Sequence, residues 1–170
     1  MSADVGAGTR ENPFIFRAEQ VIDRPVDDVF AFFSQAENLQ RLTPEWLHFK
    51  ILNIDPNPVR QGTLIRYRLR WRVFPIYWTT RITVWEPPHR FVDEQLRGPY
   101  RFWRHEHRFV SEGSGTRIHD EVRYLLPFGA LGRMVHRMQV RNDVESIFAY
   151  RHSAVTSVFN SRKNSPVKRK

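Results

Sequence analysis

The sequence contains no cysteine. A disulfide framework, a thiolate nucleophile and a cysteine-based zinc site are therefore excluded, and stability must come from a packed core. The first dozen residues lack the basic start and apolar stretch of a secretion signal. No uninterrupted apolar run approaches the roughly 18 residues that span a bilayer. We therefore expect a protein of the reducing cytoplasm.

Motifs that bind phosphate or build a catalytic nucleophile are also missing, and we expect no cofactor. Aromatic residues, by contrast, are abundant, since Phe, Trp and Tyr make up 14% of the 170 residues. Bulky rings either fill a core or line a cavity, and composition leaves both uses open. The length suits a single domain.

Basic residues exceed acidic ones and give a formal net charge of +9. The end of the chain supplies five of these charges, from Arg162, Lys163, Lys168, Arg169 and Lys170. We interpret residues 160–170 as a basic, disordered tail, because this segment is polar and contains proline. Its contact with an anionic membrane surface would be weak.

A second basic feature is the alternating stripe of Arg66, Arg68 and Arg70. Grooves that bind nucleic acid interleave exposed aromatic rings with their basic residues, and such rings are not evident here. We therefore interpret the stripe as a solvated sheet face and expect no specific nucleic-acid partner.

The apolar pattern predicts seven strands, most of them with alternating apolar and polar residues. Their predicted ranges are Pro13–Arg24, Phe49–Ile54, Leu64–Trp71, Ile76–Trp85, Arg90–Arg97, Tyr100–Val110 and Arg117–Leu126. Two short helices follow the first strand. One begins at Pro25, whose fixed φ suits a first turn, and the other covers Ala36–Leu42.

From Ala130 to about Phe159 the apolar period changes to three and four residues, which predicts a long amphipathic helix. The apolar residues of this helix are Leu131, Met134, Val135, Met138, Val144, Ile147, Phe148, Val155 and Val158. We expect Met134 and Met138 to lie in the core. Ile147 and Phe148 lie mid-helix, where contact with a ligand is possible. The domain would then span residues 13–159, after a flexible N-terminus of residues 1–12.

Three segments carry a resemblance to a known superfamily: VIDRPVDDVFAFFSQAENLQRLTP, WEPPHRFVDEQLRGPYRFWRHEHRF and GTRIHDEVRYLLPFG. With the element order, they make residues 13–157 resemble the START-like or SRPBCC superfamily, which includes the birch-pollen-allergen proteins. The similarity is closest to its bacterial polyketide cyclase/dehydrase-like branch. It implies an α+β helix-grip fold, in which a seven-stranded curved antiparallel sheet grips a long C-terminal helix around an apolar cavity. Many members bind lipids, sterols or polyketides, and a minority catalyse cyclisation, aromatisation or dehydration.

The sharpest local feature is the run from Trp103 to Phe109, which contains two histidines. Residues two apart share a strand face, so Trp103, His105, His107 and Phe109 point one way. If Ser111 lies opposite Thr116, the next hairpin pairs four residues of matching character with them: Tyr124, Val122, Asp120 and Ile118 respectively. Two histidines, an aspartate and a tyrosine would then face the cavity.

Three interpretations of this cluster stay open. It is a satisfied polar network in a core, an anchor for the polar end of an apolar ligand, or a catalytic set in which Asp120 holds His107 as a general base. The catalytic candidates are His107, His105, Asp120 and Tyr124. The predicted ligand-binding residues are Tyr67, Trp71, Gln95, Trp103, His105, His107, Tyr124 and Phe148. No metal is expected, because two histidines and one carboxylate at this spacing match no recognised signature.

The turn at Gly98-Pro99 decides which residues of the preceding strand join the histidine face. A two-residue loop places Val92, Glu94 and Leu96 there, whereas a three-residue loop places Phe91, Asp93 and Gln95 there. Burial of Phe91 favours the longer loop, and burial of Val92 and Leu96 favours the shorter one; of the two, we expect the longer. On the opposite face, the diagonal neighbours Arg104–Glu121 and Glu106–Arg123 would form ion pairs.

Overall fold

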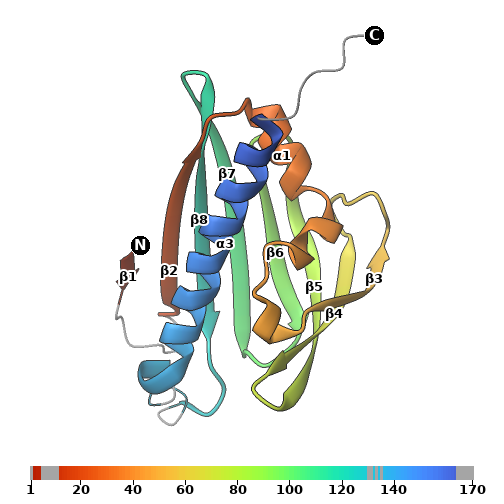
Figure 1. Cartoon of the computed structure of the whole chain (residues 1–170). Coiled ribbons are helices and arrows are strands. Elements are labelled where there is room, and N and C mark those ends of the chain that lie inside the picture. The colour runs from red at the N-terminus through yellow and green to blue at the C-terminus, as the bar shows by residue number, and fades with distance from the viewer. Residues whose placement is uncertain (1, 5–11, 130–131, 133, 135, 164–170) are drawn as a thin grey trace.

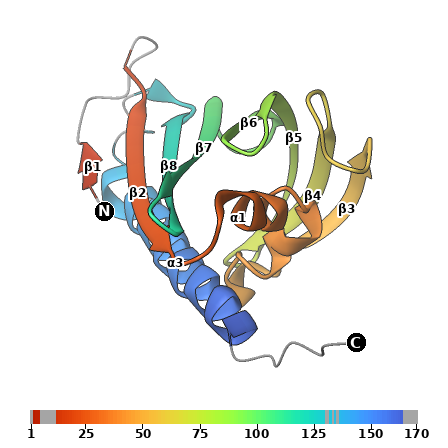
Figure 2. The same ribbon diagram turned by 90° about the horizontal axis from the view of Figure 1, so that it is seen from above.

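A curved antiparallel sheet of eight strands is closed on its concave side by helices (Figures 1 and 2). The computed structural model describes residues 2–4, 12–129, 132, 134 and 136–163. The strands are β1 (Ser2–Asp4), β2 (Phe14–Ile22), β3 (Lys50–Asp55), β4 (Leu64–Trp71), β5 (Phe74–Glu86), β6 (Arg90–Arg97), β7 (Phe102–Glu112) and β8 (Gly115–Leu125). Their spatial order is β1-β2-β8-β7-β6-β5-β4-β3.

All seven predicted strands are present, and their ends agree with the prediction to within two residues. The structure adds β1, which pairs with β2 at one edge of the sheet. Two strands distant in sequence, β2 and β8, pair along nine residues. The first of the predicted strands therefore pairs with the last. The antiparallel helix-grip architecture is confirmed.

Helix α1 (Val26–Phe33) begins after Pro25, as predicted, with Asp27 and Asp28 in its first turn. Negative charge there is favoured by the helix dipole. Two 3₁₀ turns, η1 (Ala36–Gln40) and η2 (Glu45–Leu47), follow and lead to β3. In Figure 2 these segments lie inside the arc of the sheet, so they form one wall of its interior.

The main core lies between α1 and the sheet and consists largely of phenylalanine rings. Phe109 on β7 is 1% exposed, and its ring centroid lies 5.5 Å from Phe30 and 5.3 Å from Phe33. Both contacts are edge-to-face, the arrangement that aromatic rings prefer. This cluster packs α1 against one end of β7. It does not extend over the middle of the sheet.

The long C-terminal helix begins with a π turn, η3 (His136–Val140), and continues as α3 (Arg141–Lys163). The predicted apolar positions on α3 are buried or partly buried, with Val144, Phe148 and Val155 each at most 5% exposed. Helix α3 packs on β2 and β8, where Phe148 contacts Phe16. This helix is the element that the sheet grips.

The prediction that Met134 and Met138 lie in the core is wrong, because they are 53% and 70% exposed. A regular helix turns about 100° per residue, so six positions put Met138 and Val144 about 120° apart. The apolar stripes before and after position 140 are therefore out of phase, and the intervening π turn interrupts the helix further. Two other residues of the predicted stripe, Leu131 and Val135, lie outside the described residues.

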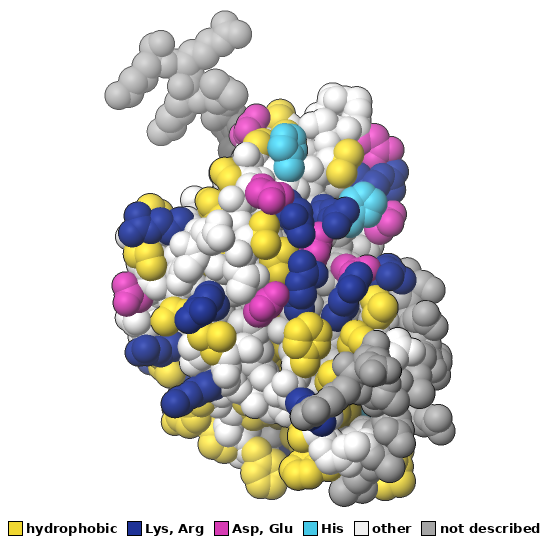
Figure 3. Space-filling view, turned by 180° about the vertical axis from the view of Figure 1, so that it is seen from behind, with side chains coloured by type: hydrophobic (Ala, Val, Ile, Leu, Met, Phe, Trp, Pro, Cys, Tyr) yellow, Lys and Arg dark blue, Asp and Glu magenta, His cyan; other side chains and the backbone are white. Residues whose placement is uncertain are grey.

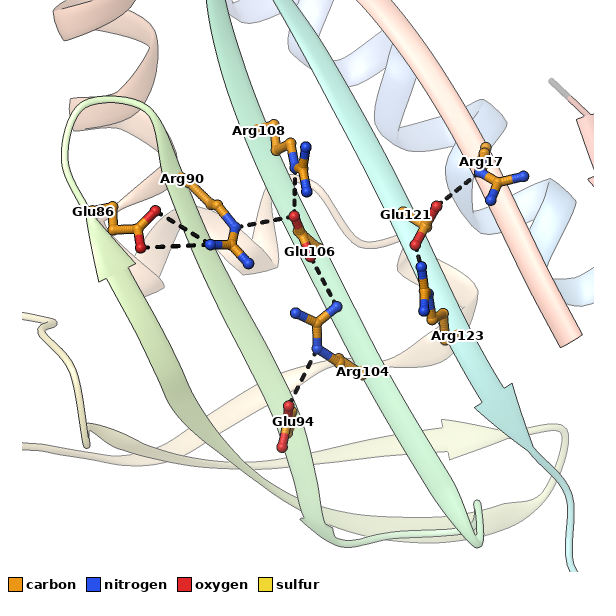
Figure 4. Close-up of polar contacts among 9 residues, drawn as sticks. All are labelled: Arg17, Glu86, Arg90, Glu94, Arg104, Glu106, Arg108, Glu121 and Arg123. Atoms are coloured by element: carbon orange, nitrogen blue, oxygen red, sulfur yellow. Dashed lines mark hydrogen bonds and ion pairs between the residues drawn. The ribbon is translucent and has the colours of Figure 1, made fainter. Parts of the chain in front are cut away.

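The convex face carries arginines interleaved with acidic side chains (Figure 3). Glu106 lies at the centre of this network, with a side chain 7% exposed. It accepts bonds from Arg90 Nε at 3.0 Å, from Arg104 Nη1 at 2.8 Å, and from Arg108 (Figure 4). The three guanidinium groups outweigh the effect of burial, which would raise its pKa, and lower the pKa of Glu106 to about 2.

The predicted diagonal pairs across β7 and β8 do not form in this network. Glu121 instead binds Arg123 on its own strand at 2.6 Å and Arg17 on β2 at 2.8 Å (Figure 4). Residues two apart on one strand are as close as diagonal neighbours, and both lie on the same face. The alternating charges therefore predicted ion pairs on this face of the sheet, but they did not predict which residues pair.

The two ends of the chain were predicted to be a flexible N-terminus and a basic, disordered tail. Helix α3 continues to Lys163, beyond the predicted domain boundary at Phe159. Residues 2–4 belong to β1 and residues 160–163 to α3, so for these residues the predicted flexible N-terminus and disordered tail are wrong. Residues 5–11 and 164–170 lie outside the described residues, and for them both stay predictions. Among the residues that are described, no helix is long and apolar enough to cross a membrane.

Candidate functional site

A cavity of about 480 Å³ lies between strands β4–β7, α1 with its following turns, and α3. Its wall is mostly apolar and includes all five tryptophans of the chain: Trp46, Trp71, Trp78, Trp85 and Trp103. The volume falls within the range of about 300–1,000 Å³ that is typical of small-molecule sites. The abundant aromatic residues therefore serve both uses, because phenylalanines form much of the core and all five tryptophans line the cavity together with several phenylalanines.

Six of the eight predicted ligand-binding residues line this cavity: Tyr67, Trp71, Trp103, His105, His107 and Phe148. Gln95 does not. Its side chain holds the β6–β7 turn, donating from Nε2 to the Tyr100 carbonyl at 2.6 Å and accepting from the Tyr100 amide at 3.3 Å.

Tyr124 and Asp120 do not line the cavity either. Both belong to β8, which α3 covers, and the cavity lies over the neighbouring strands β4–β7. Tyr124 is 3% exposed, and its hydroxyl lies 2.9 Å from His136 Nε2. Inward direction on the sheet was predicted from alternation, but alternation does not indicate which strands the helix covers.

The predicted register of β7 and β8 is confirmed, with His107 opposite Asp120 and His105 opposite Val122. The predicted position of Asp93 on the histidine face is also confirmed, because β6 pairs Asp93 with His105, and residues 98–101 connect the two strands. Cross-strand neighbours on one sheet face lie close together. The two strands that flank β7 therefore bring one carboxylate each to the two histidines.

Asp120 lies behind the two histidines, on the side away from the cavity. Its Oδ1 atom is 3.0 Å from His105 Nε2 and 2.7 Å from His107 Nδ1. A carboxylate only accepts hydrogen bonds, so His105 Nε2 donates to it, and His107 Nδ1 lies within ion-pair distance of the same oxygen. Asp120 thereby fixes both rings, with their other nitrogens, His105 Nδ1 and His107 Nε2, directed elsewhere.

Asp93 lies on the cavity side of the histidines. Its Oδ2 atom is 3.8 Å from His105 Nδ1 and 3.6 Å from His107 Nε2, and its Oδ1 is 3.2 Å from the Thr80 hydroxyl. Burial would raise the pKa of Asp93, but the contacts with the two histidines outweigh it and lower the pKa. Asp93 therefore places a negative charge at the cavity wall.

Arg151 on α3 completes the cluster and was not among the residues predicted from the sequence. Its Nη2 lies 3.5 Å from His107 Nδ1, and its guanidinium carbon lies 5.2 Å from the centre of the Phe33 ring. A signal was available, because Arg151 lies three residues after Phe148 and four before Val155, on the apolar face of the predicted helix. A charged residue on such a face needs a buried partner.

The charges of the cluster follow from these contacts. Burial would raise the pKa of Asp120, but Arg151 and the histidines hold it well below the usual range. Burial and the neighbouring His107 lower the pKa of His105 to about 4, although Asp120 and Asp93 oppose this shift. At neutral pH the cluster thus combines two carboxylates, one guanidinium and a neutral His105, and of the two carboxylates only Asp93 lies at the cavity wall.

Two buried nitrogen atoms on cavity-lining residues have no hydrogen-bond partner in the part of the chain that the structure describes. They are Trp78 Nε1 and Arg151 Nε. Leaving such a donor unsatisfied costs about 1–3 kcal/mol. Both nitrogens are covered by neighbouring atoms, so a molecule in the cavity would bring an acceptor oxygen to them only after these side chains move.

Residues 22–148 match the family model described as polyketide cyclase / dehydrase and lipid transport. The chain belongs to this family. Comparison with the curated proteins found no matching sequence.

Solved structures share the fold of this polyketide cyclase/dehydrase family member at low sequence identity. The Zhui aromatase/cyclase from a Streptomyces species superposes with a TM-score of 0.70 at 15% identity, covering 89% of this chain and 96% of that one. Norcoclaurine synthase from Thalictrum flavum, in complex with dopamine and hydroxybenzaldehyde, gives 0.66 at 14% identity, covering 89% and 88%. A Thermus thermophilus protein gives 0.63 at 20% identity, covering 85% and 98%. These similarities establish the fold alone.

Proposed function

We propose that the protein binds a hydrophobic small molecule, of the lipid, polyketide, sterol or quinone type, inside the cavity. The observation that carries this proposal is an apolar, tryptophan-lined space of about 480 Å³ with a polar cluster on one wall. Such a site buries an apolar body and orients its polar end. The open volume also speaks against an adaptor domain with a filled core.

The donors on the wall indicate the polar chemistry of the ligand. Trp78 Nε1 and Arg151 Nε are unsatisfied donors on residues that line the cavity. A carbonyl, hydroxyl or carboxylate oxygen would satisfy them, whereas a pure hydrocarbon would leave them unpaired. Oxygen-bearing ligands are therefore favoured over hydrocarbons of the same size.

Catalysis in the same cavity is the second candidate function, as a cyclase, aromatase or dehydratase. The observation in its favour is the contact of 2.7 Å between His107 Nδ1 and the Asp120 carboxylate, which leaves His107 Nε2 toward the cavity. A base held by a carboxylate has this arrangement. Tyr124 would not belong to the catalytic set, because its hydroxyl lies beside His136.

The role of His107 is testable with the dye anilinonaphthalene sulfonate, an aromatic anion that fluoresces in apolar sites. We expect His107→Gln to stay folded and to bind the dye about 3- to 10-fold more weakly, since one hydrogen bond contributes about 0.5–1.5 kcal/mol. Quenching of tryptophan fluorescence would report binding directly, because every tryptophan lines the cavity.

The matched control for this experiment is His119→Gln. His119 lies on the convex face, where Nδ1 contacts Glu19 at 3.0 Å, and its substitution should leave dye affinity unchanged. Equal affinity of His107→Gln and wild type would contradict the anchoring role. A His107→Gln variant that bound candidate substrates normally but no longer converted them would favour the catalytic function instead.

A further inference from the structure

Three acceptor atoms converge on the cavity side of the histidine cluster. They are His105 Nδ1, His107 Nε2 and a carboxylate oxygen of Asp93. The two nitrogen-to-oxygen distances of 3.8 and 3.6 Å are too long for hydrogen bonds. The three groups therefore surround a common point without binding one another.

Asp120 lies on the far side of the two rings from this point. It accepts a hydrogen bond from His105 Nε2 and lies 2.7 Å from His107 Nδ1. When both neutral rings turn their N–H groups to Asp120, their lone pairs are on the nitrogens that face Asp93. Two lone pairs and a carboxylate at close range repel one another unless a positive charge lies between them. A cation at the common point would remove this repulsion.

The separations suit a divalent transition metal. Zinc binds imidazole nitrogen and carboxylate oxygen at about 2.0–2.2 Å, so two ligands of one tetrahedral ion stand about 3.4 Å apart. The observed nitrogen-to-oxygen distances of 3.6 and 3.8 Å need only a few tenths of an ångström of contraction, and all three ligand atoms lie within 4.8 Å of one another. Histidine ligands of metals also usually donate their other ring nitrogen to a carboxylate, and Asp120 lies in this position beside both rings.

We propose that Asp93, His105 and His107 form a binding site for a divalent transition metal, with the remaining coordination positions open to the cavity. All three residues line the cavity, so an oxygen atom of a bound ligand would reach the ion. From the sequence, Asp93 was predicted on the histidine face only if the β6–β7 loop was the longer one, and no metal was expected. The structure supplies Asp93 from β6 as the third ligand, with Asp120 as the group that orients both rings.

The competing explanation is a proton on His107, which would place an imidazolium between Asp120 and Asp93. With both rings neutral, Asp93, Asp120 and Arg151 sum to one negative charge, which either a proton or a metal ion could offset. If a proton on His107 offsets the charge, the site needs no metal ion. If a metal ion offsets it, the ion must bind with a defined stoichiometry and a characteristic spectrum. Titration with a metal ion therefore distinguishes the two explanations.

The experiment uses the full chain without a polyhistidine tag, treated with chelator and titrated with Co²⁺ alone. We expect saturable binding of one ion per chain, with visible absorption bands of a four- or five-coordinate site, and competition by Zn²⁺. Asp93→Asn should weaken Co²⁺ affinity by more than about 100-fold, whereas Asp120→Asn should weaken it by about 10- to 100-fold, as outer partners do. His119→Gln, on the convex face, is the control and should bind as wild type does.

Asp93→Asn is well suited to this test, since the amide matches the carboxylate in shape and its oxygen can still accept from Thr80. Circular dichroism would establish that each variant is folded. Absence of saturable Co²⁺ binding by the wild-type chain would overturn the metal site, as would equal affinity of the folded Asp93→Asn variant. Neither result would affect the proposed binding of a hydrophobic molecule, because no such molecule is present in the titration.

Discussion

Phe109→Ala should lower the free energy of unfolding by about 3–5 kcal/mol, the range found for truncation of a phenylalanine in a filled core. Phe109 is 1% exposed and contacts the rings of Phe30, Phe33 and Phe91. The loss is expected to be large because neighbouring rings on several sides would lose their contacts. Urea denaturation followed by far-ultraviolet circular dichroism measures it.

Phe148→Ala is the informative counterpart, because Phe148 is 5% exposed but lines the cavity. One side of its ring faces open space, so we expect a smaller loss of stability, on the order of 2 kcal/mol. Its affinity for anilinonaphthalene sulfonate should fall about 3- to 10-fold through lost ring contact. Equal losses of stability in the two variants, with unchanged dye affinity for Phe148→Ala, would contradict the placement of the cavity.

Arg151→Met should destabilise the fold by about 3 kcal/mol, because it leaves Asp120 as a buried carboxylate without its cation. Arg151 is the residue that most strongly offsets the effect of burial on the pKa of Asp120. The matched control on the same helix is Arg141→Met. Arg141 pairs with Glu145 at 3.0 Å with both side chains more than one-third exposed, and this loss should stay below about 0.5 kcal/mol.

A double-mutant cycle attributes the effect of Arg151 to Asp120. Asp120→Asn removes the charge that Arg151 neutralises, so the double variant should recover part of the stability lost by Arg151→Met. We expect a coupling energy of about 1–3 kcal/mol, which is typical of residues in one buried network. Strictly additive single effects would show that Arg151 stabilises the fold by packing on Phe33 and Phe148 instead.

The fold could be predicted from the sequence because its strands alternate cleanly and its hairpins are short. The register of β7 and β8 followed from one turn, Ser111 opposite Thr116, since each later pair joined residues of matching character. Strand β1 offered no such pattern, because Ser2–Asp4 is short and polar and lies at an edge of the sheet. Its pairing depends on β2 and not on its own sequence.

The sequence predicted the members of the candidate site only where the direction of a side chain from its strand determines whether it reaches the cavity. His105 and His107 were placed at the cavity by alternation, and Asp93 by the three-residue loop. Tyr124 has the same inward direction but lies beneath the helix, and Gln95 is used by a turn. Which strands a helix covers is a tertiary property, set by the packing of Phe148 and Val144 on β2 and β8.

Native mass spectrometry tests the central claim most directly, that the cavity holds a hydrophobic molecule. The protein is measured as purified and after incubation with an organic-solvent extract of bacterial cells, beside Ile147→Trp, which fills the cavity, and Ser146→Trp, on the exposed face of the same helix. We predict a discrete adduct of one small molecule per chain on wild type and Ser146→Trp, and its loss on Ile147→Trp. Bare protein masses in every sample, or the same adduct on all three proteins, would contradict the account.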